Sequence, residues 1–280
     1  MINSSMVNKP FGLRLVNVTA AVVVLLLASV STALAANSAT CSGGSIAPGL
    51  YSSLTIAGTC AVDSGSVTVQ HNLTVLPGAT LVAVTGGVDG NGFGIFSSDL
   101  TVGGNLDVQA GAILYIGCEP IAQLCPNDPN PFPGLYHTQH VIGGNLTAEN
   151  ALAVVIHHTT VQGNLSINGG GGGVSCAASV PALGGAPPYG DFEDMSIGGQ
   201  LTVTGWQSCW LGVFRTTVDH NLTLTGDITA DPDGNEVAHN TVGGNLSCSG
   251  NVPANQTGDS AGGPNTVLGN ATGQCAGLVN

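Results

Sequence analysis

Positively charged residues are almost missing from this 280-residue sequence. It contains 3 Lys and Arg residues against 16 Asp and Glu residues. Lys9 and Arg14 lie in the first 35 residues, so Arg215 alone faces 16 acidic residues in the rest of the chain, a formal charge of −15. A chain this negative is a poor partner for nucleic acid or for an anionic membrane surface.

Large side chains and closely spaced cysteines are also scarce. Aromatic residues make up 4% of the sequence, whereas Gly occurs 43 times. We therefore expect many tight turns rather than a layered core of bulky side chains. None of the 8 Cys residues forms a C-x-x-C pair, so the cysteines do not indicate zinc.

The N-terminus has the order of a secretory signal peptide. Lys9 and Arg14 precede an apolar run over residues 18–34, and small residues lead to Ala35. We predict that residues 1–35 are a signal peptide and that residues 36–280 form one secreted, extracellular domain with no membrane segment after cleavage. An uncleaved anchor is the alternative, because the run approaches the roughly 20 residues that span a bilayer.

One motif recurs along the exported part. "TVGGNL" begins at Thr101 and again at Thr241, and five related versions begin at Thr68, Val141, Thr160, Ser196 and Thr217. Each unit reads strand, turn, strand, turn, strand, and the shortest intervals indicate one coil of roughly 20 residues. The sequence therefore predicts an all-β solenoid. Residues 117–137, residues 168–194 and the tail after residue 251 break the period as loop insertions rich in Pro and Gly.

The repeat also predicts which side chains are buried. Side chains alternate along a strand, so Val102, Leu106 and Val108 should point inward while Thr101 and Asp107 point outward. Stacking coils at about 4.8 Å places Leu on Leu in one continuous ladder. The expected ladder is Leu73, Leu106, Leu146, Leu165, Leu201, Leu222 and Leu246.

An Asn or Gln precedes each ladder leucine. We expect a sharp corner of positive φ at these residues, which Asn tolerates better than most side chains, and amide hydrogen bonds between coils. Some corners also read as glycosylation sequons, but Gln200 keeps the amide without the sequon, which favours a structural role. The sequons are at Asn72, Asn145, Asn164, Asn221 and Asn245.

Stacked coils bring residues about one coil apart within disulfide range. Because an even number of cysteines in an exported chain favours disulfides, we predict four of them. The pairs are Cys41–Cys60, Cys118–Cys125, Cys176–Cys209 and Cys248–Cys275.

The repeat resembles those of right-handed parallel β-helix proteins, an architecture used by pectin-degrading enzymes and surface adhesins. The stretch "DPDGNEVAHNTVGGNLSCSGN" running on to "GDSAGGPNTVLGNATGQCAG" resembles a group of secreted bacterial proteins of uncharacterised function. The resemblance implies a single-stranded right-handed parallel β-helix and no particular activity. Lyases of this fold imply basic residues and calcium, and the shortage of basic residues argues against that chemistry.

Two acidic segments are candidates for chemistry. Asp191, Glu193 and Asp194 in "GDFEDM" could supply an acid and a base for hydrolysis, but we expect an exposed acidic loop. "DPDGNE" has oxygen ligands at alternating positions, as calcium loops do, but we favour a simple turn, which needs no metal. The calcium candidates are Asp231, Asp233, Asn235 and Glu236.

Histidines and aromatic residues are the remaining candidates. His137, His140, His157 and His158 have no acidic partner at metal-binding spacing, so we expect surface positions for them. The ligand-binding candidates are Trp206, Trp210 and Arg215, with Tyr189 and Phe214 nearby. Core packing of the two Trp residues is the alternative, and we favour it because a buried Trp contributes a large area.

Three functions are compatible with these features. The first is a secreted, non-enzymatic solenoid with a structural or binding role at or near the bacterial cell surface. The second is a glycan-binding or glycan-active extracellular protein. The third is an ice- or mineral-binding face formed by the outward Thr and Ser residues. We predict no catalytic residues and no cofactor other than a calcium ion. The expected outward row is Thr74, Thr147, Ser166, Thr202, Thr223 and Ser247.

Overall fold

The computed structural model describes residues 36–63, 65–84, 98–117, 140–258 and 262–280. The predicted signal peptide, the predicted Cys118–Cys125 disulfide and His137 lie outside these ranges. The described chain consists of short strands and one 3-10 turn, η1 (Pro181–Leu183). This content agrees with the predicted all-β class.

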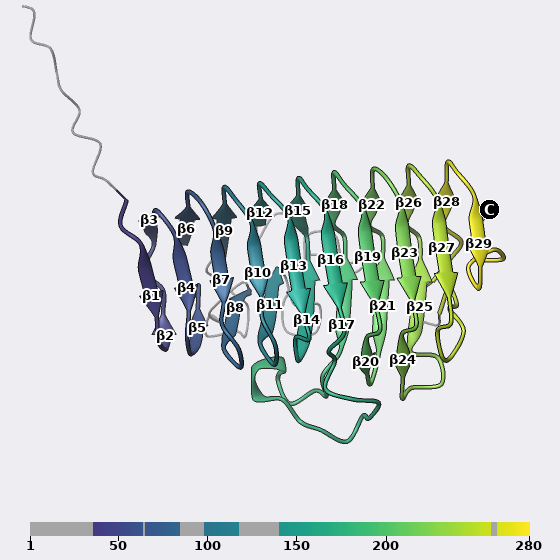
Figure 1. Ribbon diagram of the computed structural model, residues 1–280, viewed down its shortest axis with the longest axis horizontal. Helices are drawn as coiled ribbons and strands as arrows, with labels where there is room; N and C mark the ends of the chain where they lie inside the picture. The colour runs from purple at the N-terminus through teal and green to yellow at the C-terminus, as the bar shows by residue number, and fades with distance from the viewer. Residues whose placement is uncertain (1–35, 64, 85–97, 118–139, 259–261) are drawn as a thin grey trace, which may run out of the picture. The chain divides into compact units, whose positions relative to one another are not determined.

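The strands build three long parallel sheets, here named A, B and C, and most coils add one strand to each (Figure 1). Sheet A contains β1 (Ala39–Cys41), β4 (Leu54–Ile56), β7 (Leu73–Val75), β10 (Leu106–Val108), β13 (Leu146–Glu149), β16 (Leu165–Asn168), β19 (Leu201–Thr204), β23 (Leu222–Thr225), β27 (Leu246–Ser249) and β29 (Ala271–Gly273). Sheet B contains β2 (Gly44–Ser45), β5 (Thr59–Ala61), β8 (Thr80–Val84), β11 (Ile113–Gly117), β14 (Ala153–His157), β17 (Gly190–Glu193), β21 (Leu211–Phe214) and β25 (Asn235–Ala238).

Sheet C completes each coil, and neighbouring strands in it also pair in parallel. It contains β3 (Gly49–Tyr51), β6 (Gly65–Val69), β9 (Ser98–Val102), β12 (His140–Ile142), β15 (Thr159–Val161), β18 (Ser196–Ile197), β22 (Thr217–Val218), β26 (Thr241–Val242) and β28 (Thr266–Val267). A two-stranded sheet joins β20 (Gln207–Ser208) to β24 (Ile228–Thr229). The chain is therefore a parallel β-solenoid, as predicted.

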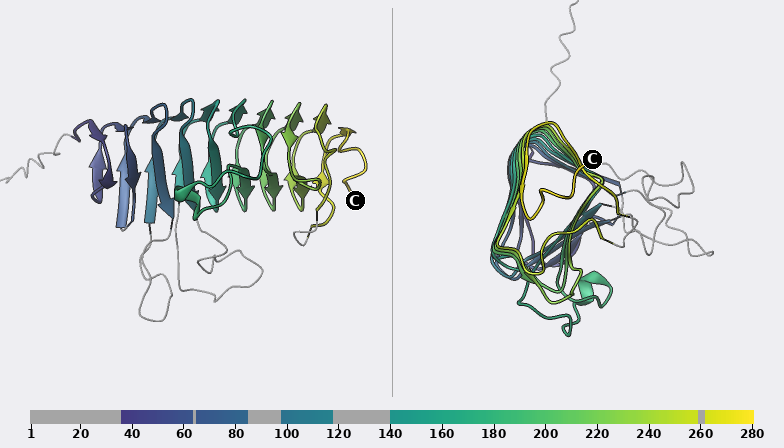
Figure 2. Two further views of the ribbon diagram at one scale, coloured as in Figure 1. Left: turned by 90° about the horizontal axis from the view of Figure 1, so that it is seen from below. Right: turned by 90° about the vertical axis from the view of Figure 1, so that its right-hand side faces the viewer.

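The three sheets enclose one interior in the end-on view of Figure 2, and the inward side chains of their strands form the buried core. The leucine ladder is confirmed, because Leu106 pairs in register with Leu73 and Leu146, and the pairing continues to Leu246. Val102 and Leu106 are fully buried, whereas Thr101 and Asp107 are half-buried on the outside. Each leucine of the ladder is therefore buried by packing against the neighbouring coils.

The corner amides form a hydrogen-bonded ladder. The backbone N–H of Asn105 donates to Oδ1 of Asn72 over 2.9 Å, and Asn145 N–H donates to Oδ1 of Asn105 over 2.8 Å. The glycine before most corners makes room for this amide, because a Cβ at Gly104 would overlap Oδ1 of Asn72; His71 and His220 take that place before Asn72 and Asn221. The same bond recurs at Asn164, Gln200, Asn245 and Asn270.

The expectation of positive φ at these corners is wrong. None of the corner Asn residues has positive φ; among the described non-glycine residues, positive φ occurs at Asn150, His158, Asp194, Arg215 and His239. The repeated Asn is therefore explained by its side-chain oxygen, which accepts the hydrogen bond from the next coil.

Three of the predicted disulfides are present. Cys41–Cys60 and Cys248–Cys275 join residues 19 and 27 positions apart, about one coil. Cys176–Cys209 ties the insertion after β16 to the segment before β21. These three bonds use every cysteine in the described ranges.

The insertion between β16 and β17 packs on the outer face of sheet B. Val180 and Leu183, at its η1 turn, are buried against Ile113, Tyr115 and Val155. This outer face therefore has a small hydrophobic cluster of its own, separate from the core inside the coils. The polar residues described below lie on the same sheet, toward the ends of its strands.

Candidate functional site

Four consecutive coils place titratable residues at the corner between sheets B and C. We call His158, Asp194, Arg215 and His239 the charged corner. Their φ angles are 47°, 52°, 47° and 56°, a left-handed conformation that costs a non-glycine residue roughly 1–2 kcal/mol. The corner between sheets A and B also turns through left-handed residues, but there most coils use glycine. The glycines are Gly169, Gly205, Gly226 and Gly250.

Arg215 holds two carboxylates at this corner. Its Nη2 donates to Glu193 Oε2 over 2.8 Å, and its Nε and Nη2 donate to both oxygens of Asp194 over 2.9 Å. Burial alone would lower the pKa of Arg215, but the hydrogen bonds and charges of Asp194 and Glu193 outweigh it and raise the pKa. The pairing joins consecutive coils and keeps Arg215 charged.

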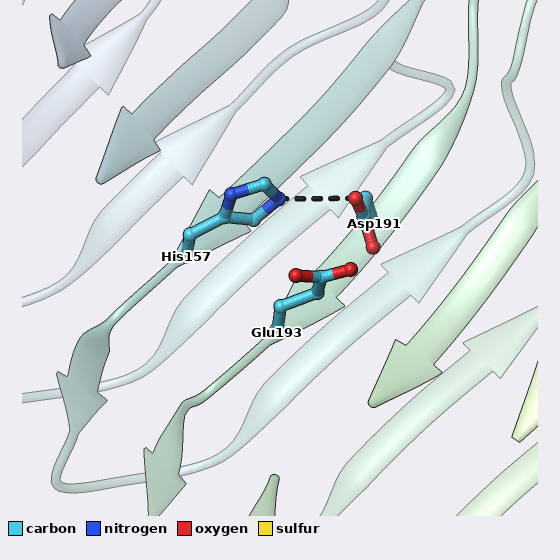
Figure 3. Close-up of side chains that lie close together, drawn as sticks. All are labelled: His157, Asp191 and Glu193. Atoms are coloured by element: carbon cyan, nitrogen blue, oxygen red, sulfur yellow. Dashed lines mark hydrogen bonds and ion pairs between the residues drawn. The ribbon is translucent and has the colours of Figure 1, made fainter. Parts of the chain in front are cut away.

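His157 and Asp191 form a second contact on the outer face of sheet B (Figure 3). His157 Nε2 lies 3.0 Å from Asp191 Oδ2, and both side chains are buried. Burial raises the pKa of Asp191, and the charge of His157 opposes that effect. Burial and the neighbouring Asp191 also raise the pKa of Glu193, to about 7.

The prediction of an exposed acidic loop is wrong. Asp191 and Glu193 belong to β17, in register with Val155 and His157 of β14, and Asp191 is only 6% exposed. Both carboxylates point outward, because the intervening Phe192 is in the core. The acidic segment is thus a fixed part of the sheet, tied to the neighbouring coil.

A cleft of about 350 Å³ lies beside this cluster. The charged corner contributes His158 and Asp194 to its wall, and Thr160 and Ser196 on sheet C add hydroxyl groups. His140, Val141, Thr159 and Met195 complete the lining. The cleft therefore combines a carboxylate, imidazoles and hydroxyls with a small apolar surface.

The prediction of surface histidines is wrong for His140 and His157. His140 is 1% exposed, and its Nδ1 accepts from the backbone N–H of Leu100 over 3.2 Å. Burial lowers the pKa of His140 to about 4, so its ring is neutral at neutral pH. His157 has the acidic partner that sequence spacing did not reveal, namely Asp191.

The two tryptophans have different environments. Trp206 is fully buried, and its Nε1 donates to Ser208 Oγ over 2.8 Å, so its ring is core and not a surface for a ligand. Trp210 is half-buried and stacks on Phe214, with centroids 5.6 Å apart, while Tyr189 lies 6.2 Å from it. Trp210 remains a ligand-binding candidate, one coil from Glu193.

The calcium candidates do not converge on one ion. Asp231 and Asp233 belong to a turn closed by the Gly234 N–H to Asp231 carbonyl bond of 3.0 Å. Asn235 and Glu236 are adjacent on β25, so their side chains point to opposite faces of sheet B. The simple turn is therefore the better explanation of "DPDGNE".

The outward hydroxyl row on sheet A follows the predicted register, from Thr74 to Ser247. Asp107 interrupts it, and its Oδ1 accepts from Thr147 Oγ1 over 2.6 Å. An ice- or mineral-binding role for this face stays a prediction.

Comparison of the chain with protein-family models, curated proteins and solved structures finds no match. Among the described residues, no helix has the length and hydrophobicity required to cross a lipid bilayer.

One signal in the sequence would have found the cluster. The repeat motif starts at Thr160, Ser196, Thr217 and Thr241 in four successive coils. The residues three positions before these starts pair in register with one another, and they are His157, Glu193, Phe214 and Ala238. Counting back two reaches the four residues of the charged corner. The repeat motif therefore aligns sites that the insertions separate along the chain.

Proposed function

We propose that this protein is a secreted, non-enzymatic β-solenoid that binds a neutral extracellular glycan at or near the bacterial cell surface. The observation that carries the proposal is the charged corner. Four coils use His, Asp, Arg and His in a left-handed conformation for which glycine is better suited. Strained backbone of this kind concentrates at functional sites, and two of these residues line the cleft.

The chemistry of the cleft suits sugar hydroxyls. The Asp194 carboxylate accepts hydrogen bonds, the hydroxyls of Thr160 and Ser196 both donate and accept, and the His158 ring does either according to its tautomer. Trp210 lies outside the cleft lining, on the adjacent coil, and offers a stacking surface to a glycan that extends beyond the cleft. The formal charge of −15 beyond residue 35 disfavours polyanionic glycans such as polyuronates.

Export is supported by three disulfides, which form in oxidising compartments. The signal-peptide pattern and the resemblance of the C-terminal segment to secreted bacterial proteins point the same way. Both remain proposals drawn from the sequence.

Hydrolysis of a glycan is the second candidate. Ligand atoms of Asp191 and Glu193 lie within 4.8 Å of one another, close to the about 5 Å spacing of retaining glycosidases, and burial raises the pKa of Glu193 to about 7, as a general acid requires. Against it, the Asp191 side chain is only 9% exposed, and Arg215 occupies Glu193 Oε2. We therefore favour binding without turnover.

The test combines a binding panel with product assays. The mature protein is titrated with oligosaccharides of cellulose, chitin and xylan, and with pectin and alginate, while reducing ends and unsaturated products are measured. We expect a neutral glycan to bind and no product to form. His158→Ala, Ser196→Ala and Trp210→Ala should each weaken binding about tenfold or more, as loss of one good contact does.

Thr223→Ala on sheet A is the matched control and should bind as the wild type. Equal binding by all three site variants would overturn the placement of the site. Turnover that disappears in Asp191→Asn or Glu193→Gln would overturn the non-enzymatic assignment.

A further inference from the structure

His157, Asp191 and Glu193 gather three ligand-type side chains from two neighbouring strands of sheet B. His157 ends β14, and it pairs in register with Glu193 of β17. One donor atom from each side chain lies within 4.8 Å of the others. The parallel register therefore holds an imidazole and two carboxylates on one outward face.

Asp191 carries an independent sign that something binds here. It is only 6% exposed, and its Oδ2 is the oxygen that contacts His157 Nε2. Its Oδ1 is buried with no hydrogen-bond partner among the described residues. In Figure 3 this second oxygen lies on the side of Glu193. A buried carboxylate oxygen is expected to have a partner, and the place of Oδ1 beside Glu193 suits a cation.

The charges of the surroundings agree with a cation. Asp191, Glu193 and Asp194 are acidic, and Arg215 is the basic residue that pairs with two of them. Metal binding requires a neutral imidazole and ionised carboxylates, and in that state three carboxylates against one guanidinium leave two negative charges in a largely buried cluster. Buried charges in proteins are paired or coordinate metals, and one divalent cation balances this excess.

We propose that His157, Asp191 and Glu193 bind a divalent transition-metal cation of the Zn²⁺ class. An imidazole nitrogen with carboxylate oxygens suits Zn²⁺, Mn²⁺ or Co²⁺, whereas Ca²⁺ and Mg²⁺ prefer oxygen ligands alone. The site is distinct from the "DPDGNE" turn, which holds none of these residues.

The geometry requires little movement. Zn²⁺ bonds of about 2.0–2.2 Å in a tetrahedron place donor atoms roughly 3.4 Å apart, and His157 Nε2 and Asp191 Oδ2 are already 3.0 Å apart. The cation replaces the hydrogen bond between His157 and Asp191, and Oδ1 or Oδ2 of Asp191 becomes its ligand. Arg215 keeps Oε2 of Glu193, so Oε1 faces the ion. The Glu193 side chain is 15% exposed, which leaves a path for the ion and for a water as fourth ligand.

The test uses tag-free mature protein treated with a chelator and titrated with Zn²⁺ in a calorimeter. Co²⁺ serves as a second probe, because its visible spectrum reports tetrahedral coordination. We expect one equivalent of Zn²⁺ to bind and Co²⁺ to give an intense tetrahedral spectrum. His157→Gln and Asp191→Asn should each weaken Zn²⁺ binding by at least about 100-fold, more than loss of a second-shell partner does.

Asp227→Asn is the control, since it changes a buried carboxylate of the same solenoid outside the cluster. It should bind Zn²⁺ as the wild type does. Cooperative thermal unfolding of each variant without metal shows that it is folded. Failure of folded wild-type protein to bind Zn²⁺ and Co²⁺, or undiminished binding by both ligand variants, would overturn the site. The titration contains no glycan, so its outcome is independent of the proposed glycan binding.

Discussion

The backbone N–H of Trp206 donates to Oδ1 of Asp227, one coil further along, over 2.8 Å. The backbone N–H of Asp227 in turn donates to Oδ1 of Asn251 over 2.9 Å. Asn251 uses its second side-chain atom as well, because its Nδ2 donates to the carbonyl of Leu224. Asp227 has no such donor when ionised, and its Oδ2 is buried without a partner among the described residues.

Asp227→Asn is therefore expected to stabilise the protein. The new amide keeps the Oδ1 acceptor and adds an Nδ2 donor, directed toward the carbonyl of Val203 by the register of Val203 with Leu224. Removing an unsatisfied buried group is worth about 1–3 kcal/mol. Urea unfolding at pH 7 measures the gain, and a variant less stable than the wild type would contradict it.

The same residue gives stability a pH dependence. Burial raises the pKa of Asp227 from 3.8 to about 7, against the opposing hydrogen bonds from backbone N–H groups. Between these values the folded protein holds a proton that the unfolded chain has lost, so the free energy of unfolding falls as pH rises. The stability advantage of Asp227→Asn should be small at pH 4 and reach its maximum above pH 7. A pH-independent difference would refute this.

The leucine ladder predicts unequal effects at two neighbouring positions. Leu222 is fully buried and pairs with Leu201 and Leu246, whereas Thr223 is half-buried on the outer face. Leu222→Ala opens a cavity and should cost about 2–5 kcal/mol, while Thr223→Ala should change stability by less than about 0.5 kcal/mol. Denaturant titrations compare the two, and similar losses would mean that the two faces are misassigned.

The glycines of the repeat are expected to be intolerant of even one methyl group. A Cβ at Gly199 would overlap Oδ1 of Asn164 and approach the backbone of Gly163. Gly199→Ala should therefore cost about 1–3 kcal/mol, as overpacking does. Gly277 is the control, because nothing lies within 4 Å of a Cβ built there. Thermal unfolding of both variants shows whether the corner requires glycine.

The fold was predictable because its rules are local. Period-2 alternation and the repeated "GNL" corner determine the register of Leu106 with Leu146 without knowledge of distant residues. The polar cluster was not predicted, because His157 and Asp191 are 34 residues apart and the insertion between them hides that they are one coil apart. Their burial also depends on how that face is covered, which the repeat pattern does not encode. The prediction of positive φ at the corners was wrong because Asn suits a corner for two reasons, its tolerance of positive φ and its side-chain oxygen. The sequence does not distinguish the two reasons.

The charged corner gives the last prediction, which separates the loss of a cleft side chain from the relief of backbone strain. His239 and His158 both have left-handed φ angles, and relief of that strain by glycine is worth about 1 kcal/mol, which offsets part of the side-chain interactions that each histidine loses. His239→Gly and His158→Gly should therefore have similar stabilities. Of the two residues only His158 lines the cleft, so His158→Gly should bind glycan more weakly, whereas His239→Gly should bind as the wild type does. Thermal unfolding and glycan titration of both variants separate the two effects. If His158→Gly retained full affinity, the strained residues of this corner would be structural and the proposed binding site would have to lie elsewhere.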